Sequence, residues 1–516
     1  MYLSVIRAPP PAGDPQLPAP SRGSGPVLRP PAVGTLAQEL AAYEFTHVND
    51  QQLSDEHMSV YRGKSECRFG LYSMSTHVGP ISDIKDFLVP RFGIKVTDLN
   101  FHEGHCARVG NCAVNQGLKI IDHRDIYTLG ACPGITKRRF FYEYREWVQE
   151  NVDAFLCTHP AGICEAYMAF NKSIMVIATT RFDLARADEA VCMDGFVNNL
   201  RRLAADPRNV IAANNLYDVH YIRFFTGIQN VELIPSYCGY VSATYKPAAE
   251  NRLLVGLSRG ITFTESLFNP LRAIWDSSRT QRKFTLTMQA ALGSYKYADL
   301  TAFKGVVVIP YQCSIMSIFE YYRMGIPMIV PSLDLLTSWH MDWRCVRERT
   351  WDGAIHHRYL GASRYPRHSE AESLADWDPN NELNATVVRQ WLSFSDFYHW
   401  PHVILFDSWE DLAQKLDAAD FHEISRGMLD YSDKLRRQLE NKWKSVMDRM
   451  WGEVPGPGGR KVSRNYDEAM QKLWGIAPPA DPCEECELRP QLDEEQDGIR
   501  RVWAKQKLQF EDEETW

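Results

Sequence analysis

The segment with the clearest chemical potential runs from Gln312 to Val330. An apolar run ending at Pro310 predicts a strand, followed by a loop and then a helix that carries Glu320. Gly325 and Pro327 end that helix, because glycine adopts the left-handed helix-end conformation and proline cannot continue a helix. Ligands of open α/β sheets bind beyond the carboxyl ends of the strands, and a helix N-terminus there favours an anion such as a diphosphate. A carboxylate on the first turns of such a helix can accept hydrogen bonds from a ribose diol.

A regular alternation of strands and helices must position this segment. Strand-like runs such as Asp153–Thr158, Ser173–Thr179 and Asn209–Ala213 alternate with helical patterns of about ten residues. This alternation predicts a parallel sheet with both faces covered. After a polar connection at 237–251 the pattern restarts with the apolar run Arg252–Leu257. We therefore expect two α/β domains in series.

The C-terminal part contains a long predicted helix, Ile424–Trp451, with one apolar stripe. We expect this stripe to dock against another domain. A Pro-rich leader precedes the first domain, and a Pro/Gly linker and an acidic tail follow the helix. The predicted division is a disordered leader at 1–45, a first domain at 46–240, a second domain at 241–423, a return helix at 424–451, and a linker and tail at 452–516.

The segment around Glu320 resembles the donor-site element of GT-B glycosyltransferases, in which a glutamate precedes Gly, an apolar residue, Pro and an apolar strand. The resemblance implies that Glu320 binds the ribose of a nucleotide sugar. Arg252–Gly260 resembles the first strand of a GT-B donor domain, whose loop supplies a basic residue to the diphosphate, here Arg259 or, as a second choice, Lys283. The implied donor site comprises Glu320, Arg259, Ser314, Ser317, Gln312 and Gly325.

The resemblance extends weakly over residues 66–451. It implies an α/β fold class with two Rossmann-like domains facing across a cleft and a C-terminal helix returning to the first domain. One position departs from the pattern. Retaining GT-B enzymes commonly carry two glutamates separated by seven residues, and the first falls here on Gln312, which is not an acid. The departure argues against a retaining reaction and leaves a non-catalytic protein as an alternative.

An inverting transfer needs a general base for the acceptor hydroxyl. His77 and His159 each follow a predicted strand of the first domain, and we assign them as candidate bases. Lower-ranked candidates are Asp83 and Glu165. Thr179–Arg181 and Asn214–Asn215 also lie at strand ends, where they could contact an acceptor or cap helices; we favour capping for the asparagine pair.

Other motifs carry weaker signals. Trp339 and His340 suit stacking on a sugar or base, with a buried tryptophan as the alternative. The group from His102 to Cys112 and the lone CxxC at Cys483–Cys486 lack standard zinc spacing. The DxD at Asp376–Asp378 is interpreted as a solvated loop, so we predict no metal.

The composition of the chain excludes some classes of protein and limits its location. The chain has 516 residues, 45% of them hydrophobic, and a net charge of −8. A large core is therefore expected, and a general nucleic-acid binder is disfavoured. No apolar run reaches the ~18 residues needed for a transmembrane helix. Twelve thinly spread cysteines favour a reducing compartment, and so a cytoplasmic location. The sequons at Asn171 and Asn384 keep a secretory lumen open, and the acid-poor leader with its three arginines keeps an organelle open.

The sequence therefore predicts a metal-independent, inverting glycosyltransferase without a cofactor, whose partners are a nucleotide sugar and an unknown acceptor: a glycan, lipid, protein or small molecule. The alternatives are an enzyme resembling nucleotide-sugar epimerases and a non-catalytic GT-B-like binding protein.

Overall fold

The computed structural model describes residues 69–100, 134–184, 190–248, 251–256, 269, 283–365, 377–451 and 461–477. The predictions for the leader, Arg259, the His102–Cys112 group and the CxxC fall outside these residues, as does Asp376 of the DxD. All strands and helices of the described part belong to one compact unit, 47–516.

The first domain is built on a six-stranded parallel sheet with the order β2-β1-β3-β4-β5-β6. Every neighbouring pair of these strands is parallel. The strands are β1 (Gly70–Ser75), β2 (Lys95–Asn100), β3 (Ala154–Cys157), β4 (Ser173–Ala178), β5 (Val210–Ala213) and β6 (Glu232–Leu233). The helices are α3 (Val78–Phe92), α6 (Gly134–Asn151), the 3-10 helix η1 (Ala161–Phe170), α7 (Ala190–Ala205) and α8 (Leu216–Thr226).

The second domain contains a five-stranded parallel sheet with the order β11-β10-β9-β7-β8. Its strands are β7 (Arg252–Gly256), β8 (Thr285–Met288), β9 (Gly305–Val308), β10 (Met328–Pro331) and β11 (Ile404–Phe406). Its helices are η4 (Gln289–Leu292), α11 (Tyr297–Thr301), α12 (Met316–Met324), α13 (Leu333–Trp343), η5 (Arg347–Arg349), α14 (Trp351–His356), α15 (Ala385–Leu392), η7 (Asp396–Tyr398) and α16 (Trp409–Ala418).

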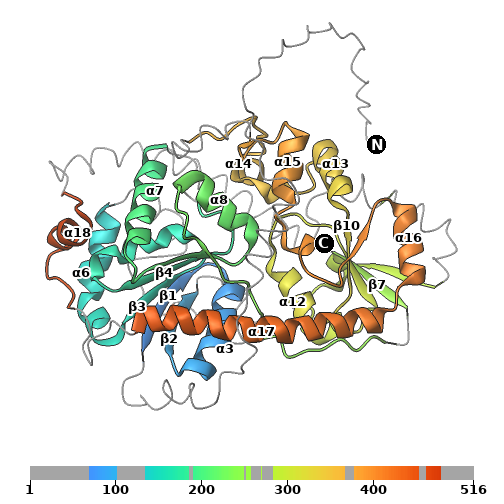
Figure 1. Ribbon diagram of the computed structural model, residues 1–516, viewed down its shortest axis with the longest axis horizontal. Coiled ribbons are helices and arrows are strands. Elements are labelled where there is room, and N and C mark those ends of the chain that lie inside the picture. Colours follow the sequence, from blue (N-terminus) through green and yellow to red (C-terminus); the bar gives the residue numbers. More distant parts are fainter. Residues whose placement is uncertain are drawn as a thin grey trace, which may run out of the picture. The chain divides into compact units, whose positions relative to one another are not determined.

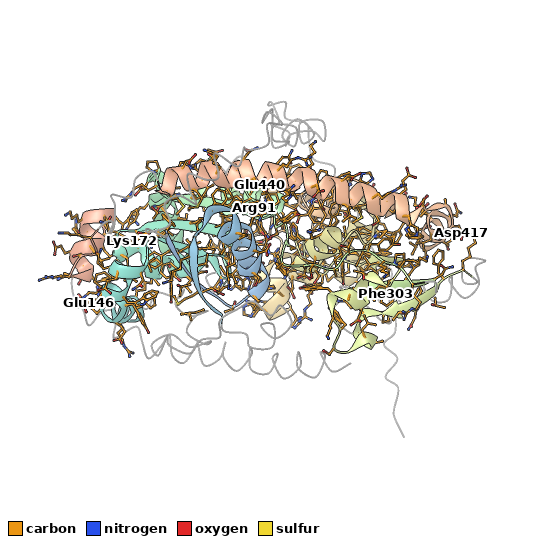
Figure 2. The ribbon with its side chains drawn as sticks, turned by 90° about the horizontal axis from the view of Figure 1, so that it is seen from below. Arg91, Glu146, Lys172, Phe303, Asp417 and Glu440 are labelled. Atoms are coloured by element: carbon orange, nitrogen blue, oxygen red, sulfur yellow. The ribbon has the colours of Figure 1, made fainter. Side chains whose placement is uncertain are left out.

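Helix α17 (Phe421–Trp451) connects the two domains over its whole length (Figure 1). Its first residue, Phe421, belongs to the apolar core of the second domain. Its later residues enter the core of the first domain, and they include the whole predicted stripe: Leu435, Leu439, Trp443, Val446 and Met450. Arg91 of α3 and Glu440 of α17 form an ion pair at 3.1 Å beside this core (Figure 2). The docking role predicted for this helix is therefore confirmed.

The two parallel sheets and the returning helix confirm the predicted fold class of two Rossmann-like α/β domains. The domain boundaries themselves stay predictions. The sequence analysis did not predict α18 (Tyr466–Trp474), which follows the linker. This helix packs on the first domain through Tyr466 against Phe141 and through the indole of Trp474, which donates to the carbonyl of Met168 at 2.9 Å.

Gly325 ends α12 as predicted, with φ at +72°. A Cβ atom at this position would lie 2.9 Å from Leu429 and Ser425 of α17. We expect Gly325→Ala to lower the free energy of unfolding by about 2 kcal/mol or more, because the left-handed conformation and the close contact both oppose a side chain. Denaturant unfolding measures this loss. Gly195→Ala in α7, where a Cβ meets nothing within 4 Å, should be neutral or slightly stabilising; equal losses in both variants would contradict the explanation.

Candidate functional site

The strand order creates one switch point in each sheet. From β1 the chain passes to β2 on one side and then to β3 on the other. From β7 it passes to β8 and then, on the opposite side, to β9. Ligands of open α/β sheets bind at such points, beyond the carboxyl ends of the two strands where the order reverses. The residues following β1, β3 and β9 are therefore the first to consider.

His77 and His159 follow β1 and β3, and the structure brings them together. Their ring centroids lie 5.6 Å apart with the planes inclined at 72°. The two loops are joined by backbone hydrogen bonding, since Thr76 N donates to the carbonyl of His159 at 3.0 Å. His77 occupies the N-cap position of α3, but its side chain does not cap the helix. Both imidazoles are half-buried at one switch point, which is an arrangement suited to acid–base chemistry.

Gly79 of α3 lies between His77 and Met316, the first residue of α12. A Cβ built on Gly79 would lie 3.4 Å from Cε1 of His77 and 3.5 Å from the methyl carbon of Met316. Asn214, after β5, and Ser236, after β6, both contact the sulfur of Met316, at 3.8 and 3.7 Å. The first turn of α12, which carries half-buried Ser317, therefore approaches the carboxyl ends of the first sheet. Unpaired N–H groups of a helix start attract anions there.

Glu320 lies one turn further along α12, where two phenols hold its carboxylate. Tyr240 and Tyr297 donate hydrogen bonds to Oε1 of Glu320 at 2.6 and 2.8 Å. Tyr240 belongs to the connection between the domains and Tyr297 to α11. Burial is the largest cause that raises the pKa of each phenol; Glu320 raises it further, after Cys238 in the case of Tyr240, so both remain donors. The carboxylate is thus oriented before any ligand arrives.

Gln312 and Ser314 both lie in the loop after β9, but their side chains have different partners and different burial. The side-chain amide of Gln312 donates a hydrogen bond to the carboxylate of Glu348 in η5. Ser314 is buried, and its hydroxyl donates to Asp396 at 2.9 Å. Burial raises the pKa of Asp396 well above its ordinary value although this bond opposes the shift. The hydroxyl of Ser314 is therefore engaged within the second domain, whereas Gln312 is only half-buried.

The other candidates from the sequence have structural partners. Lys283 is exposed and pairs with Asp417 at 3.1 Å. Glu165 contacts Lys137 of α6 and Asn199 of α7. Asn215 caps α8, as predicted, by accepting from Asp218 N at 2.8 Å. Asn214 instead faces Ser236 and Met316.

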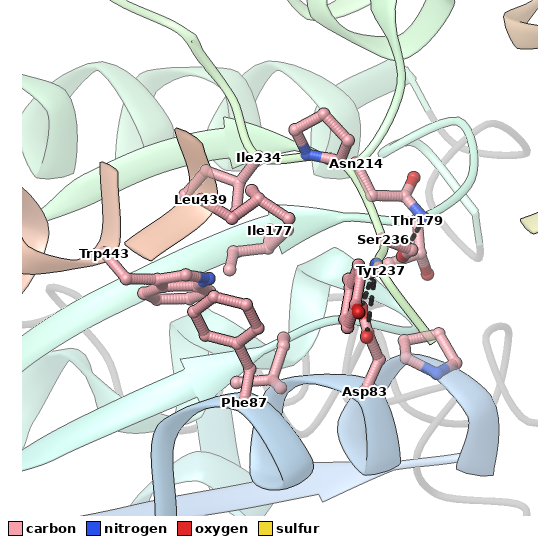
Figure 3. A pocket seen from close by; sticks show the side chains of 13 residues that line it. Asp83, Phe87, Ile177, Thr179, Asn214, Ile234, Ser236, Tyr237, Leu439 and Trp443 are labelled. Atoms are coloured by element: carbon pink, nitrogen blue, oxygen red, sulfur yellow. Dashed lines mark hydrogen bonds between the residues drawn. The ribbon is translucent and has the colours of Figure 1, made fainter. Parts of the chain in front are cut away.

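Asp83 lines a pocket in the first domain between α3, the ends of β4 to β6 and α17 (Figure 3). Its carboxylate accepts the backbone N–H of Cys238 at 2.6 Å and that of Tyr237 at 3.2 Å. Burial raises the pKa of Asp83 to about 7, while these two bonds lower it. The side chain ties α3 to the segment after β6, which gives it a structural role.

A buried contact region joins the domains beside the site. Arg181, after β4, is fully buried, and its guanidinium lies 5.2 Å from the ring of Trp351 in α14. The expectation that Thr179–Arg181 reaches an acceptor is therefore wrong for buried Arg181, whereas Thr179 is half-buried and lines the pocket of Figure 3. Asp183 accepts hydrogen bonds from Tyr221 of the first domain and Tyr365 of the second. Burial raises the pKa of Asp183 to about 6, and the two phenols partly offset this rise.

Two other motifs from the sequence, Trp339–His340 and the DxD, have structural roles in the described residues. Trp339 is buried in the second core and packs on Trp409 at 4.6 Å between ring centroids, and His340 is buried beside Glu382. Asp378 is buried, not solvated as predicted, because it accepts from the backbone and hydroxyl of Ser363. Within the described ranges no three metal-ligating side chains come together.

Sequence reasoning missed Tyr240, Tyr297, Met316 and Glu348. Tyr240, Tyr297 and Glu348 belong to no motif and reach the site through tertiary contacts, whereas Met316 lies within the Gln312–Val330 segment but was given no role. The sequence offered a clue only for Met316, because it is the first helical residue after the loop that follows β9 and so had to lie near the carboxyl ends of the strands.

Comparisons with protein families, curated sequences and solved structures gave the following results. No protein-family profile matches the chain, and no curated protein sequence matches it. Among solved structures, the glycosyltransferase SnogD from Streptomyces nogalater has 11% identity over 73% of this chain and 99% of its own, with a TM-score of 0.35. The spinosyn rhamnosyltransferase SpnG, complexed with thymidine diphosphate, has 10% identity over 76% and 98%, with a TM-score of 0.31. TarM has 10% identity over 61% of this chain and 58% of its own, with a TM-score of 0.34.

No helix in the described part of the chain combines the length and apolar character needed to cross a bilayer.

Proposed function

We propose that this protein is a glycosyltransferase that moves a sugar from a nucleotide-sugar donor to an acceptor by an inverting, metal-independent reaction. One observation carries the proposal: the histidine pair at the switch point of the first sheet and the start of α12 in the second domain approach the same point, because a Cβ on Gly79 would lie 3.4 Å from His77 and 3.5 Å from Met316. A reaction between a donor held by one domain and an acceptor held by the other needs this juxtaposition.

The second domain supplies groups suited to a nucleoside diphosphate. Glu320 would accept hydrogen bonds from the ribose diol, and Tyr240 and Tyr297 would hold its carboxylate in place. The backbone N–H groups at the start of α12 would bind the diphosphate, with Ser317 beside them. Arg259, which follows β7 in the sequence and lies outside the described residues, would add a positive charge. These groups would stabilise the leaving diphosphate without a metal.

The first domain supplies the base. His77 or His159 would accept the proton of the acceptor hydroxyl as that oxygen attacks the anomeric carbon, and the second imidazole would orient the first. Attack from the face opposite the leaving diphosphate inverts the configuration. Asn214 and Ser236 lie at neighbouring strand ends and would contact the acceptor or the donor sugar.

Thermal unfolding with UDP, GDP, ADP and CMP sugars tests the proposal. We expect one of these donors to stabilise the wild-type protein, by about 2.7 kcal/mol at 100 times its Kd. Glu320→Ala and Glu320→Gln should weaken binding of that donor by roughly 10- to 100-fold, because a charge-assisted hydrogen bond to the ribose is lost. Glu423→Gln, an exposed change in the first turn of α17, is the matched control. A folded wild-type protein that none of these donors stabilises would overturn the donor site.

The two alternatives predict different outcomes. A non-catalytic binding protein would be stabilised by a donor but release no nucleoside diphosphate from it. An epimerase-like enzyme would change the sugar without needing an acceptor. Product analysis after incubation with the stabilising donor separates the three functions.

A further inference from the structure

The connection from the first domain to the second begins with a tight turn at residues 237–241, which we call the connecting turn. The backbone N–H of Val241 donates to the carbonyl of Cys238 at 3.0 Å and closes the turn. Cys238 has a left-handed backbone conformation, with φ at +54°, which residues other than glycine rarely adopt. Such a conformation persists only where the surrounding structure holds it. The contacts around this turn therefore fix its shape.

Helix α3 of the first domain holds one side of the connecting turn through two carboxylates, three residues apart on one helix face. Asp83 is buried and accepts the N–H of Cys238 at 2.6 Å and that of Tyr237 at 3.2 Å (Figure 3). Burial raises the pKa of Asp83, and these two bonds oppose the rise, so the carboxylate and the turn stabilise each other. A Cβ atom on Gly239 would clash with the carboxylate of Asp86, which shows how closely the turn lies on the helix.

Helix α12 of the second domain holds the other side through a second pair three residues apart, Glu320 and Arg323. The hydroxyl of Tyr240 donates to Oε1 of Glu320 at 2.6 Å. The guanidinium of Arg323 lies 5.2 Å from the centroid of the Tyr237 ring. Burial raises the pKa of Asp86, and the charge of Arg323 is among the effects that oppose this rise. The connecting turn is thus held by one helix of each domain.

The two sides of the connecting turn are joined by very little chain. Cys238, whose N–H is bound by Asp83, is separated from Tyr240 by one glycine. We propose that Asp83 is a positioning residue for the donor: it fixes the connecting turn, the turn fixes Tyr240, and Tyr240 orients the carboxylate of Glu320. This inference rests on the proposed function. Donor binding in the second domain then depends on a buried carboxylate of the first.

Donor binding by variants of Asp83 tests this dependence. The probe is whichever of UDP-glucose, GDP-mannose and ADP-glucose binds the wild type most tightly. Asp83→Ala should raise its Kd roughly tenfold, the scale of one lost hydrogen bond to a charged group. Asp83→Asn keeps one acceptor oxygen and should raise the Kd less; it carries the test where the alanine variant does not fold. Tyr240→Phe, which removes the hydroxyl on Glu320, should match Asp83→Ala.

The double variant Asp83→Ala/Tyr240→Phe separates positioning from two independent effects. If both residues act through the same turn, the Kd of the double variant should lie within about twofold of that of the weaker-binding single variant. Independent effects would multiply to roughly 100-fold. A multiplied loss, or a Kd for both Asp83 variants equal to that of the wild type, would overturn the proposal.

Leu439→Ala is the matched structural control. Leu439 lines the same pocket as Asp83 from α17, and its apolar side chain makes no hydrogen bond to the connecting turn. The variant should lower the free energy of unfolding through the cavity that it leaves, but it should keep the Kd of the donor. A rise in Kd equal to that of Asp83→Ala would show that Asp83 contributes only general stability, and would overturn its positioning role.

Amide hydrogen exchange of the segment 237–241 needs no donor and separates the two proposals. Asp83→Ala should speed exchange of this segment by roughly tenfold through local opening, and Leu439→Ala should not. Unchanged exchange in Asp83→Ala would overturn the positioning role. If the donor binds the wild type and Asp83→Ala equally, the positioning role fails and the proposed function survives. If no donor binds the wild type, the proposed function fails and the donor role of Asp83 fails with it, even where exchange shows that Asp83 holds the turn.

Discussion

Replacing His77 or His159 with asparagine should lower the turnover of the nucleotide-sugar donor by about 10²- to 10⁴-fold, the usual contribution of a general base. The two rings meet edge to face at the switch point of the first sheet, and only Gly79 separates His77 from Met316 at the start of α12. Asparagine keeps a polar side chain in the same loop but accepts no proton from a hydroxyl. Release of nucleoside diphosphate measures the rate, with water as the acceptor until the natural one is known.

The pH dependence of the rate separates the two histidines. The residue that acts as the base produces the loss of rate at low pH, so its asparagine variant should lack this limb. The variant of the partner should be slow but retain the limb, since that residue only positions the first. His422→Asn, an exposed change at the start of α17, should leave rate and profile unchanged. Rates within about threefold of wild type in both site variants would exclude a base in this pair.

Arg349→Ala should lower the free energy of unfolding by about 3–5 kcal/mol, the cost of leaving one charge of a buried ion pair alone. Arg349 is completely buried and lies 3.2 Å from the carboxylate of Glu382. Its guanidinium also donates to the carbonyls of Pro379 and Asn381. Alanine at this position would remove a donor from both carbonyls and would leave Glu382 with His340 but without the guanidinium charge.

The same prediction has a pH signature. Burial alone would raise the pKa of Glu382, but Arg349 and His340 lower it to about 2. Because the folded pKa lies below the unfolded one, near 4.5, the stabilisation is complete above the unfolded value and is lost as the pH falls toward 2. The difference in stability between wild type and Arg349→Ala should therefore shrink in acid.

Denaturant unfolding between pH 3 and pH 7 measures both effects. Arg358→Ala is the control, because Arg358 pairs with Asp352 at the surface and such pairs contribute at most about 1 kcal/mol after screening by solvent. Arg349→Lys keeps the charge but not the planar group, and should fall between the two. Equal losses for Arg349→Ala and Arg358→Ala would show that the buried pair does not stabilise the fold.

The fold was largely predictable because its signals are local. A strand of a parallel sheet covered on both faces needs a continuous apolar run, and a covering helix needs an apolar stripe; both patterns are read over neighbouring residues. The stripe from Leu435 to Met450 is an example, since each member of it enters the first core. The ends of strands were equally visible, which is why His77 and His159 were candidates before the structure placed them; Gln312 was a candidate through the resemblance to the GT-B donor-site element.

The sequence by itself thus determined two α/β domains, a docking helix and the strand ends where chemistry can occur. The tertiary structure decided which strand ends face each other, because strand order is set by pairing between distant segments. It placed His77 beside His159, Glu348 beside Gln312, and Tyr240 and Tyr297 on Glu320. It also assigned Ser314 to Asp396 and buried Arg181 under Trp351. Residue type and spacing show which groups can react; only the folded chain fixes the partners that hold them.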